Sequence, residues 1–229
     1  MMMRDPTKQQ QRAQRLLEAA AQLLLRWGYQ RVTIEEIARH AHVATGTVYL
    51  HWKTKEAIFE TVLLREMAAL WREMLHRIQT DPQQALVHCV MRSLFLLIRT
   101  RPLATALFTQ DRDLLGHLSF GLSMPVPMQG QEFIKQLRQF GLVRTDCTNE
   151  AQTYAFTATV SGFVLLDPAQ TQVSLEEKAQ ALAQTIRLAF EPETLPASTF
   201  LQEQVVPWWT RLLEQACEFC EEQIQERMT

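Results

Sequence analysis

Residues 33–55 carry the side chains in this sequence that are best suited to contact a nucleic acid. Two threonines, a glycine, a tyrosine and a histidine fall within residues 45–51, a stretch too short to bury all of them. Small hydroxyl groups beside an aromatic ring suit a groove lined with phosphates, and a lysine at a helix start adds positive charge to free backbone amides. The spacing therefore predicts DNA contacts from Thr33, Thr45, Gly46, Thr47, Tyr49, His51 and Lys55.

Two short helices joined by a tight turn are needed to present these side chains. Thr33 and Glu36 have the spacing of a capping box, which predicts a helix start directly after Thr33. Apolar residues then recur every three or four positions until His42, where the chain must turn. A short second helix is expected over residues 45–49, and Thr54 is placed to cap a third helix. The predicted unit is a helix-turn-helix.

The same segment resembles the DNA-binding domain of TetR-type transcriptional regulators. The resemblance covers the N-terminal quarter of the chain and is carried by Ile37-Ala38, Val43, Gly46-Thr47, Tyr49, His51, Lys55-Glu56 and, upstream, Leu16, Ala19, Ala20, Leu23, Leu24, Trp27, Gly28 and Tyr29. The family commonly has Gly in place of His42, Ser in place of Ala44 and Phe in place of Trp52. Histidine tolerates a positive φ, whereas the loss of serine removes a helix cap and a phosphate contact.

The resemblance implies an all-α protein with two domains. Residues 1–54 are expected to form a three-helix DNA-binding domain, and residues 55–229 a helical domain that binds a small molecule and dimerises. A homodimer would place two recognition helices about one DNA turn apart, roughly 34–36 Å, on a palindromic double-stranded operator. The leading interpretation is a repressor released by an apolar or amphipathic small molecule. A transcriptional activator, a DNA-binding adaptor for a protein partner and a helical enzyme or carrier are the alternatives.

Charge is unevenly distributed along the chain. The net charge is −2, but residues 1–55 hold 9 Lys and Arg against 4 Asp and Glu. The basic excess marks the N-terminal end as the end that meets nucleic acid. Arg4, Lys8, Arg12 and Arg15 would suit an arm that reaches phosphates or a minor groove. The exposed start of a helix is the alternative.

Other chemistries find little support in the sequence. There is no nucleophile motif or glycine-rich phosphate loop, and the six histidines lack metal-ligand spacing. Cys217-x-x-Cys220 has no histidine partners, so we expect one packed and one half-exposed thiol rather than a metal or redox site. No segment has the length and apolarity of a membrane span or signal core. We therefore expect a cytoplasmic protein that is not an enzyme and binds no cofactor or metal.

Residues 55–229 follow helical patterns. We expect helices over 55–80, 82–100, 102–109, 130–140, 149–166 and 174–190, followed by two tail helices that meet at Pro207. Glycine and proline interrupt residues 110–130, which are therefore expected to move and to gate a pocket. Small side chains along 149–166 and a matching seam along 174–190 predict a four-helix dimer interface, with an internal helix pair as the alternative.

Side chains on the inward helix faces predict a pocket for an apolar guest. The candidate effector contacts are Trp71, His88, Phe95, Phe108, Phe133, Phe156, Thr159 and Phe163. Ordinary core packing is the alternative for each, because aromatic stripes at helical spacing are typical of a core. His88 is typical of a core histidine, although it would also respond to pH or to a carboxylate effector.

Overall fold

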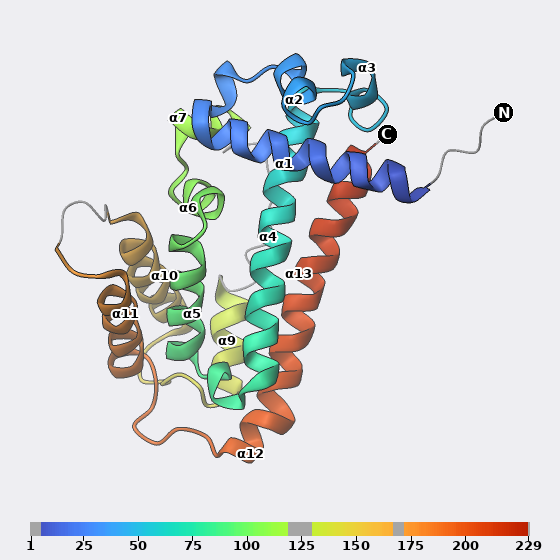
Figure 1. Ribbon diagram of the computed structural model, residues 1–229. Helices are drawn as coiled ribbons and strands as arrows, with labels where there is room; N and C mark the ends of the chain where they lie inside the picture. The colour runs from blue at the N-terminus through green and yellow to red at the C-terminus, as the bar shows by residue number, and fades with distance from the viewer. Residues whose placement is uncertain (1–5, 119–129, 167–171, 229) are drawn as a thin grey trace. The chain divides into compact units, whose positions relative to one another are not determined.

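The computed structural model describes residues 6–118, 130–166 and 172–228, and Figure 1 shows their helices. The N-terminal helices are α1 (Pro6–Arg31), α2 (Ile34–His40), α3 (Thr45–Val48) and the long α4 (Lys55–Thr80). A 3₁₀ turn, η1 (Pro82–Ala85), leads to α5 (Val87–Arg99), α6 (Pro102–Thr109) and α7 (Arg112–Leu115). There follow α9 (Gln131–Gln139), α10 (Asn149–Leu165), α11 (Leu175–Ala189), α12 (Ser198–Phe200), the π-helical turn η3 (Leu201–Val205) and α13 (Val206–Arg227). These ranges contain no strand, which confirms the all-α class.

The chain forms two compact units, each built from segments far apart in sequence. Unit 1 contains the described parts of Met1–Ala68, Pro102–Met124 and Glu218–Thr229, and unit 2 contains those of Ala69–Arg101 and Pro125–Cys217. Both α4 and α13 therefore contribute one end to each unit. This division differs from a single boundary between residues 54 and 55, because the first half of α4 and the α6–α7 segment pack with the N-terminal helices.

Unit 1 is organised around the apolar face of α1. Leu16, Ala20, Leu23 and Leu24 repeat at helical spacing, and each is at most 3% exposed. Gly28 interrupts the helix with φ 73° and ψ 161°, a conformation that favours glycine, so the predicted glycine stop is confirmed. The same core takes in buried residues from α2, α3, the link between α3 and α4, α4 and α6, among them Ile37, Ala38, Val48, Trp52, Ile58, Phe59 and Leu103.

Unit 2 is held together mainly by the packing of α5 against α11. A capping box between Ser174 and Glu177 begins α11, as Thr33 and Glu36 begin α2. Trp209 is fully buried, and its indole Nε1 donates to the carbonyl oxygen of Ala85 at 3.0 Å. The surrounding core is rich in aromatic rings, namely Phe133, Phe156, Phe190, Trp208 and Trp209, whose contacting pairs have centroids 4.6–6.1 Å apart.

Two predicted helices differ from the observed ones. The helix expected over 82–100 is divided, because Leu86 is extended with ψ 142° and separates η1 from α5. The break expected at Pro207 is absent. A π-helical turn leads directly into α13 instead, and Pro207 lies in the first turn, where its missing amide costs little.

The structure also bears on two further predictions, which concern the basic residues near the N-terminus and the exposure of Cys217 and Cys220. Helix α1 begins at Pro6, so Lys8, Arg12 and Arg15 belong to an ordered helix rather than an arm, while Arg4 lies outside the described residues. Cys217 and Cys220 form no disulfide and are both buried, so the expected half-exposed thiol is wrong. The two thiols lie three residues apart and therefore share the buried face of α13.

The predicted gate over 110–130 is described only at its ends. Helix α7 occupies part of it, with the Asp111 side chain accepting from the Leu114 amide as its cap. Residues 119–129 of this prediction lie outside the described residues. Across the described ranges, no helix combines the length and apolarity needed to span a bilayer.

Candidate nucleic-acid interface

The start of α2 is fixed by the predicted capping box. The Thr33 backbone amide donates to Glu36 Oε2 at 2.9 Å, and the Glu36 amide donates to Thr33 Oγ1 at 3.2 Å. The Thr33 hydroxyl also donates to the Glu36 carboxylate. Thr33 is exposed, but its hydroxyl is already engaged within the protein, so its first role is to set the direction of α2.

The turn after α2 and the short α3 follow the predicted pattern. His42 adopts a φ of 54°, where the family commonly has glycine. Ala44 caps α3 without a side-chain hydrogen bond, as its lack of a hydroxyl requires. Gly46 is exposed, and Thr45 and Thr47 are half-buried, while Val48 anchors α3 in the core.

Tyr49 and Leu50 present unusually large apolar surfaces at the end of α3. Tyr49 is 50% exposed and Leu50 is 44% exposed. Together with Gly46 they form an outward surface at a helix-turn-helix, where apolar groups can meet thymine methyls and a phenol can meet phosphate. Leu50 was absent from the predicted contacts. Its exposure depends on how α3 is seated, which the sequence pattern alone does not reveal.

His51 corrects the predicted set of contacts. It is only 3% exposed, and its ring lies against that of Trp52 with centroids 5.4 Å apart. Trp52 is itself fully buried, and its Nε1 donates to the Thr61 hydroxyl at 3.0 Å. His51 therefore packs inward beside Trp52 and presents too little surface for a DNA contact.

The side chain of Lys55 is engaged within the protein, whereas the sequence predicted that its charge would bind phosphate. Its Nζ donates to the Tyr29 carbonyl oxygen at 2.8 Å and lies 4.1 Å from the centroid of the Tyr29 ring. Partial burial lowers the pKa of Lys55, although the charges of Glu56 and Glu36 oppose this effect. The neighbouring Lys53 is exposed and directly precedes Thr54, the cap whose hydroxyl accepts from the Ala57 amide. The sequence analysis missed Lys53, whose exposed position makes it a better candidate than Lys55 for a phosphate contact.

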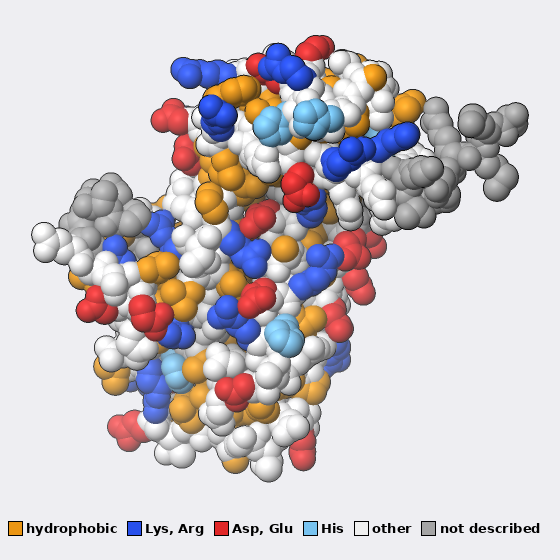
Figure 2. Space-filling view, viewed as in Figure 1, with side chains coloured by type: hydrophobic (Ala, Val, Ile, Leu, Met, Phe, Trp, Pro, Cys, Tyr) orange, Lys and Arg blue, Asp and Glu red, His pale blue; other side chains and the backbone are white. Residues whose placement is uncertain are grey.

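Basic and imidazole side chains accompany this surface. Figure 2 shows Lys, Arg and His side chains over the N-terminal helices on the face in view. Arg12, Arg15 and Arg39 are exposed on α1 and α2. Such charges supply the sequence-independent part of DNA binding.

Most of the predicted effector contacts lie in the core of unit 2. Trp71, Phe95, Phe133 and Phe156 are at most 5% exposed, and Phe163 lies edge-on to Phe95 with centroids 6.5 Å apart. The Trp71 indole nitrogen is buried without a hydrogen-bond partner, which is costly for a donor. The structure therefore buries four of the predicted effector contacts in unit 2.

Three other predicted effector contacts have different surroundings. The Thr159 hydroxyl donates to the Ala155 carbonyl of its own helix at 2.8 Å. Phe108 belongs to unit 1 and not to the core that holds the others. His88 Nδ1 lies 2.8 Å from Glu191 Oε2, and the His88 amide donates to Glu191 Oε1 at 2.8 Å. His88 is thus paired internally by a carboxylate 103 residues away, which the sequence did not reveal.

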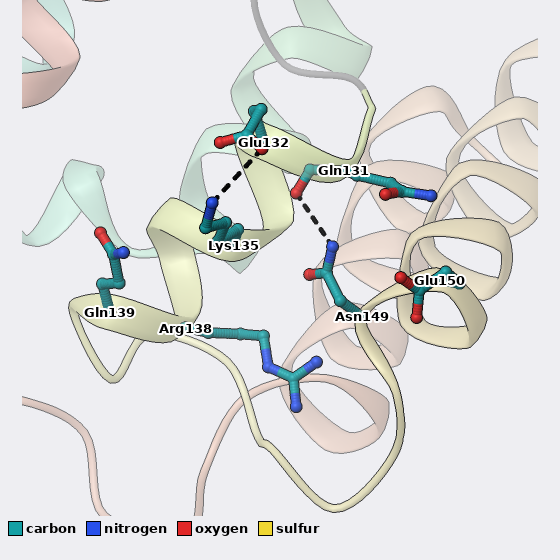
Figure 3. A pocket seen from close by; sticks show the side chains of 7 residues that line it. All are labelled: Gln131, Glu132, Lys135, Arg138, Gln139, Asn149 and Glu150. Carbon is teal, nitrogen blue, oxygen red and sulfur yellow. Dashed lines mark hydrogen bonds and ion pairs between the residues drawn. The ribbon is translucent and has the colours of Figure 1, made fainter.

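A polar surface hollow lies between α9 and the start of α10 (Figure 3). Its volume is about 530 Å³, and its cationic side chains are Lys135 and Arg138. Lys135 Nζ lies 3.5 Å from Glu132 Oε1, and Asn149 Nδ2 donates to the Gln131 carbonyl at 3.2 Å. The lining contains as many carboxylates as cationic side chains, so its charges favour neither an anion nor a cation. No group of three or more metal-ligating side chains occurs in the described part of the chain.

Comparison with known proteins supports the helix-turn-helix assignment. Residues 16–62 match the model of the family described as bacterial regulatory proteins, tetR family. An uncharacterised HTH-type transcriptional regulator of Mycobacterium bovis is 40% identical over 73 residues, which is 32% of this chain and 38% of the relative. The chain thus spans well under half of that relative's length.

Solved structures extend the likeness to the fold of both units. The fatty acid degradation regulator FadR from Bacillus halodurans aligns with a TM-score of 0.59 and 15% identity, over 81% of this chain and 96% of the other. FadR from Bacillus subtilis in complex with stearoyl-CoA aligns with a TM-score of 0.55 and 16% identity, over 76% and 96% of the two chains. At this identity the likeness concerns the arrangement of helices.

Proposed function

Because the chain belongs to the TetR family of transcriptional regulators, we propose that it is a ligand-responsive repressor. Its homodimer binds a palindromic operator and is released by an apolar or amphipathic small molecule. The observation that carries this proposal is the outward surface of α3, where Gly46 and Tyr49 are exposed on a capped helix-turn-helix. A regulator needs such a surface, whereas a helical enzyme or carrier has no use for it.

The exposed side of α10 and α11 supports dimerisation. Tyr154 is 79% exposed and Leu188 is 77% exposed, and Leu165 and Leu166 are exposed as well. Small residues accompany them along α10, and a Cβ added to Gly162 would meet nothing within 4 Å. Exposed apolar side chains beside small ones form a surface on which a second copy can approach closely. We propose that these two helices pair with the partner's as a four-helix bundle.

The proposed effector is amphipathic, and the aromatic core of unit 2 is where its apolar part would bind. Trp71 supports this placement, because its buried indole lacks an acceptor that a ligand carbonyl would supply. The B. subtilis neighbour was crystallised with stearoyl-CoA, which makes a long-chain acyl-CoA the first probe to test here. Binding in unit 2 can affect DNA because α4 belongs to both units.

The decisive experiment is binding to DNA that flanks the protein's own coding region, with and without stearoyl-CoA. We expect a footprint with two-fold symmetry, and a decrease in affinity of about 5- to 150-fold when the probe is bound. Free CoA and stearate are the controls for the two halves of the probe. Transcription in vitro then separates a repressor from an activator. Tight probe binding that leaves the footprint unchanged would reject the inducer model, and turnover of the probe would favour an enzyme.

Tyr49→Ala is expected to weaken operator binding by about 1–3 kcal/mol, because it removes the largest exposed contact of α3. Tyr49→Phe is the matched variant. It keeps the ring for a thymine methyl and removes only the hydroxyl for a phosphate. Fluorescence anisotropy on the footprinted operator measures both. Unchanged affinity of Tyr49→Ala, with an unaltered melting temperature, would remove Tyr49 from the interface.

A further inference from the structure

Tyr29 ties together three segments of unit 1. Its side chain is 3% exposed, and its hydroxyl donates to Glu56 Oε1 at 2.5 Å. Its carbonyl accepts from Lys55 Nζ at 2.8 Å, and its ring receives the same ammonium at 4.1 Å from its centroid. The end of α1 and the first turn of α4 are therefore joined at one residue by three contacts of different kinds.

The protonation of this pair fits its geometry. Burial, followed by the bond to Glu56, raises the pKa of Tyr29, so the phenol keeps its proton and donates it. The same bond is the main cause that lowers the pKa of Glu56, which stays ionised as the acceptor. The hydroxyl–carboxylate bond is thus charge-assisted and stronger than a neutral one.

The segment around α7 packs onto the same tyrosine. The His117 ring meets the Tyr29 ring edge-on, with centroids 4.9 Å apart. A Cβ on Gly116 would lie 3.1 Å from the Tyr29 ring, and a Cβ on Gly28 would lie 2.8 Å from the carbonyl oxygen of Asp113. Both glycines have positive φ, so α7 approaches α1 only because two side chains are missing there. Residues 113–117 are accordingly called the docked segment.

We infer that Tyr29 is a positioning residue for the DNA-contacting surface. It holds the first turn of α4 through Lys55 and Glu56, and the docked segment holds Tyr29 in place. Undocking of residues 113–117 therefore loosens the start of α4 and lowers operator affinity. In this arrangement Lys55 acts through Tyr29, and Lys53 is the residue that neutralises a phosphate. The inference rests on the proposed DNA binding, and it assigns to this junction the control of that binding.

The role of the docked segment is tested with a pair of glycine variants. Gly28 and Gly130 have similar backbones, with φ 73° and ψ 161° against φ 86° and ψ 175°, but nothing lies within 4 Å of a Cβ on Gly130. Gly28→Ala and Gly130→Ala thus carry similar backbone strain, and only the first pushes against Asp113. We expect Gly28→Ala to speed amide hydrogen exchange in residues 113–117 and 55–58 and to lower operator affinity by about tenfold. Gly130→Ala should change neither.

The role of Lys55 is tested by salt dependence, which counts neutralised phosphates. Lys53→Gln should lower the slope of log affinity against log salt by about one. Lys55→Met keeps an unbranched side chain of similar shape but removes the ammonium from Tyr29, and it should weaken binding several-fold with the slope unchanged. Tyr29→Phe, which keeps the ring and loses the bond to Glu56, should behave like Lys55→Met.

Two results would overturn the inference. One is a slope lowered by about one in Lys55→Met together with unchanged affinity in Tyr29→Phe, since Lys55 would then be the phosphate ligand. The other is slow exchange of residues 55–58 in Gly28→Ala despite fast exchange in residues 113–117. Hydrogen exchange needs no DNA, so this second readout holds even if the wild type binds no operator. A wild-type protein that binds no operator would reject the proposed function itself.

Discussion

Gly162→Leu is expected to turn the dimer into a monomer at micromolar concentration and to lower operator affinity by about 100-fold or more. The position is exposed on α10, and an added Cβ would meet nothing in its own chain, so the monomer fold should tolerate leucine. Between two copies the same side chain would hold the small-residue faces apart. A monomer engages only one half-site and loses the gain from linked binding, which is typically 10²- to 10⁴-fold.

Sedimentation velocity and operator binding measure the two parts of this prediction. Gln139→Leu is the control, because it adds the same side chain at an exposed position of α9 away from the proposed interface. An unchanged melting temperature at low protein concentration would show that Gly162→Leu still folds. A wild-type protein that sediments as a monomer without DNA would rule out this interface, as would a variant that remains dimeric and binds the operator normally.

The helix starts and turns of the DNA-binding region were predictable because they are local. The hydroxyl of Thr33 and the carboxylate of Glu36 need only each other, and their spacing is visible in the sequence. The same holds for Ser174 and Glu177 at α11. Gly28 ends the regular part of α1 because its own backbone adopts a positive φ that glycine readily allows, and this too is local.

The direction in which side chains of the site point was less predictable, because distant partners decide it. His51 turns inward with Trp52, and Lys55 is held by a tyrosine 26 residues earlier. No local pattern distinguishes Lys55 from Lys53, although only the latter is exposed. The sequence therefore predicted the helices of the candidate interface, but it did not reveal that His51 is buried or that Lys55 bonds to Tyr29.

Glu191 provides the clearest case of a partner hidden from the sequence. It directly follows the C-cap residue of α11, yet its carboxylate has no exposed surface and accepts from the backbone and the ring of His88. Helix α5 lacks a side-chain cap of its own at Leu86, so Glu191 supplies one from just beyond the end of α11. Arg187 Nε lies 3.7 Å from the same carboxylate. The contact between His88 and Glu191 thereby fastens the end of α11 to the start of α5.

From the contact between His88 and Glu191 we predict that the stability of unit 2 falls as the pH rises from about 6.5 to about 9. Hydrogen bonds with Cys89 and with Glu191 raise the pKa of His88 to about 9, against burial, which lowers it. The folded protein therefore holds this proton more tightly than the unfolded chain, where histidine titrates near pH 6.5. The stabilisation is fully present below pH 6.5 and is lost as the pH rises through the folded pKa.

His88→Gln isolates this contribution. A hydrogen bond to a charged group is typically worth about 1.5–3 kcal/mol, so the variant should lose that much stability at pH 6 and little at pH 9.5. In a chain of this size the loss at pH 6 corresponds to roughly 3–12 °C in melting temperature. His76→Gln, at an exposed position of α4, is the matched control and should leave the pH profile unchanged. Denaturant unfolding from pH 6 to 9.5 measures all three proteins. If His88→Gln kept the wild-type decline with pH, the charge on His88 would not be its source, and Glu191 would serve α5 only as a cap for its backbone.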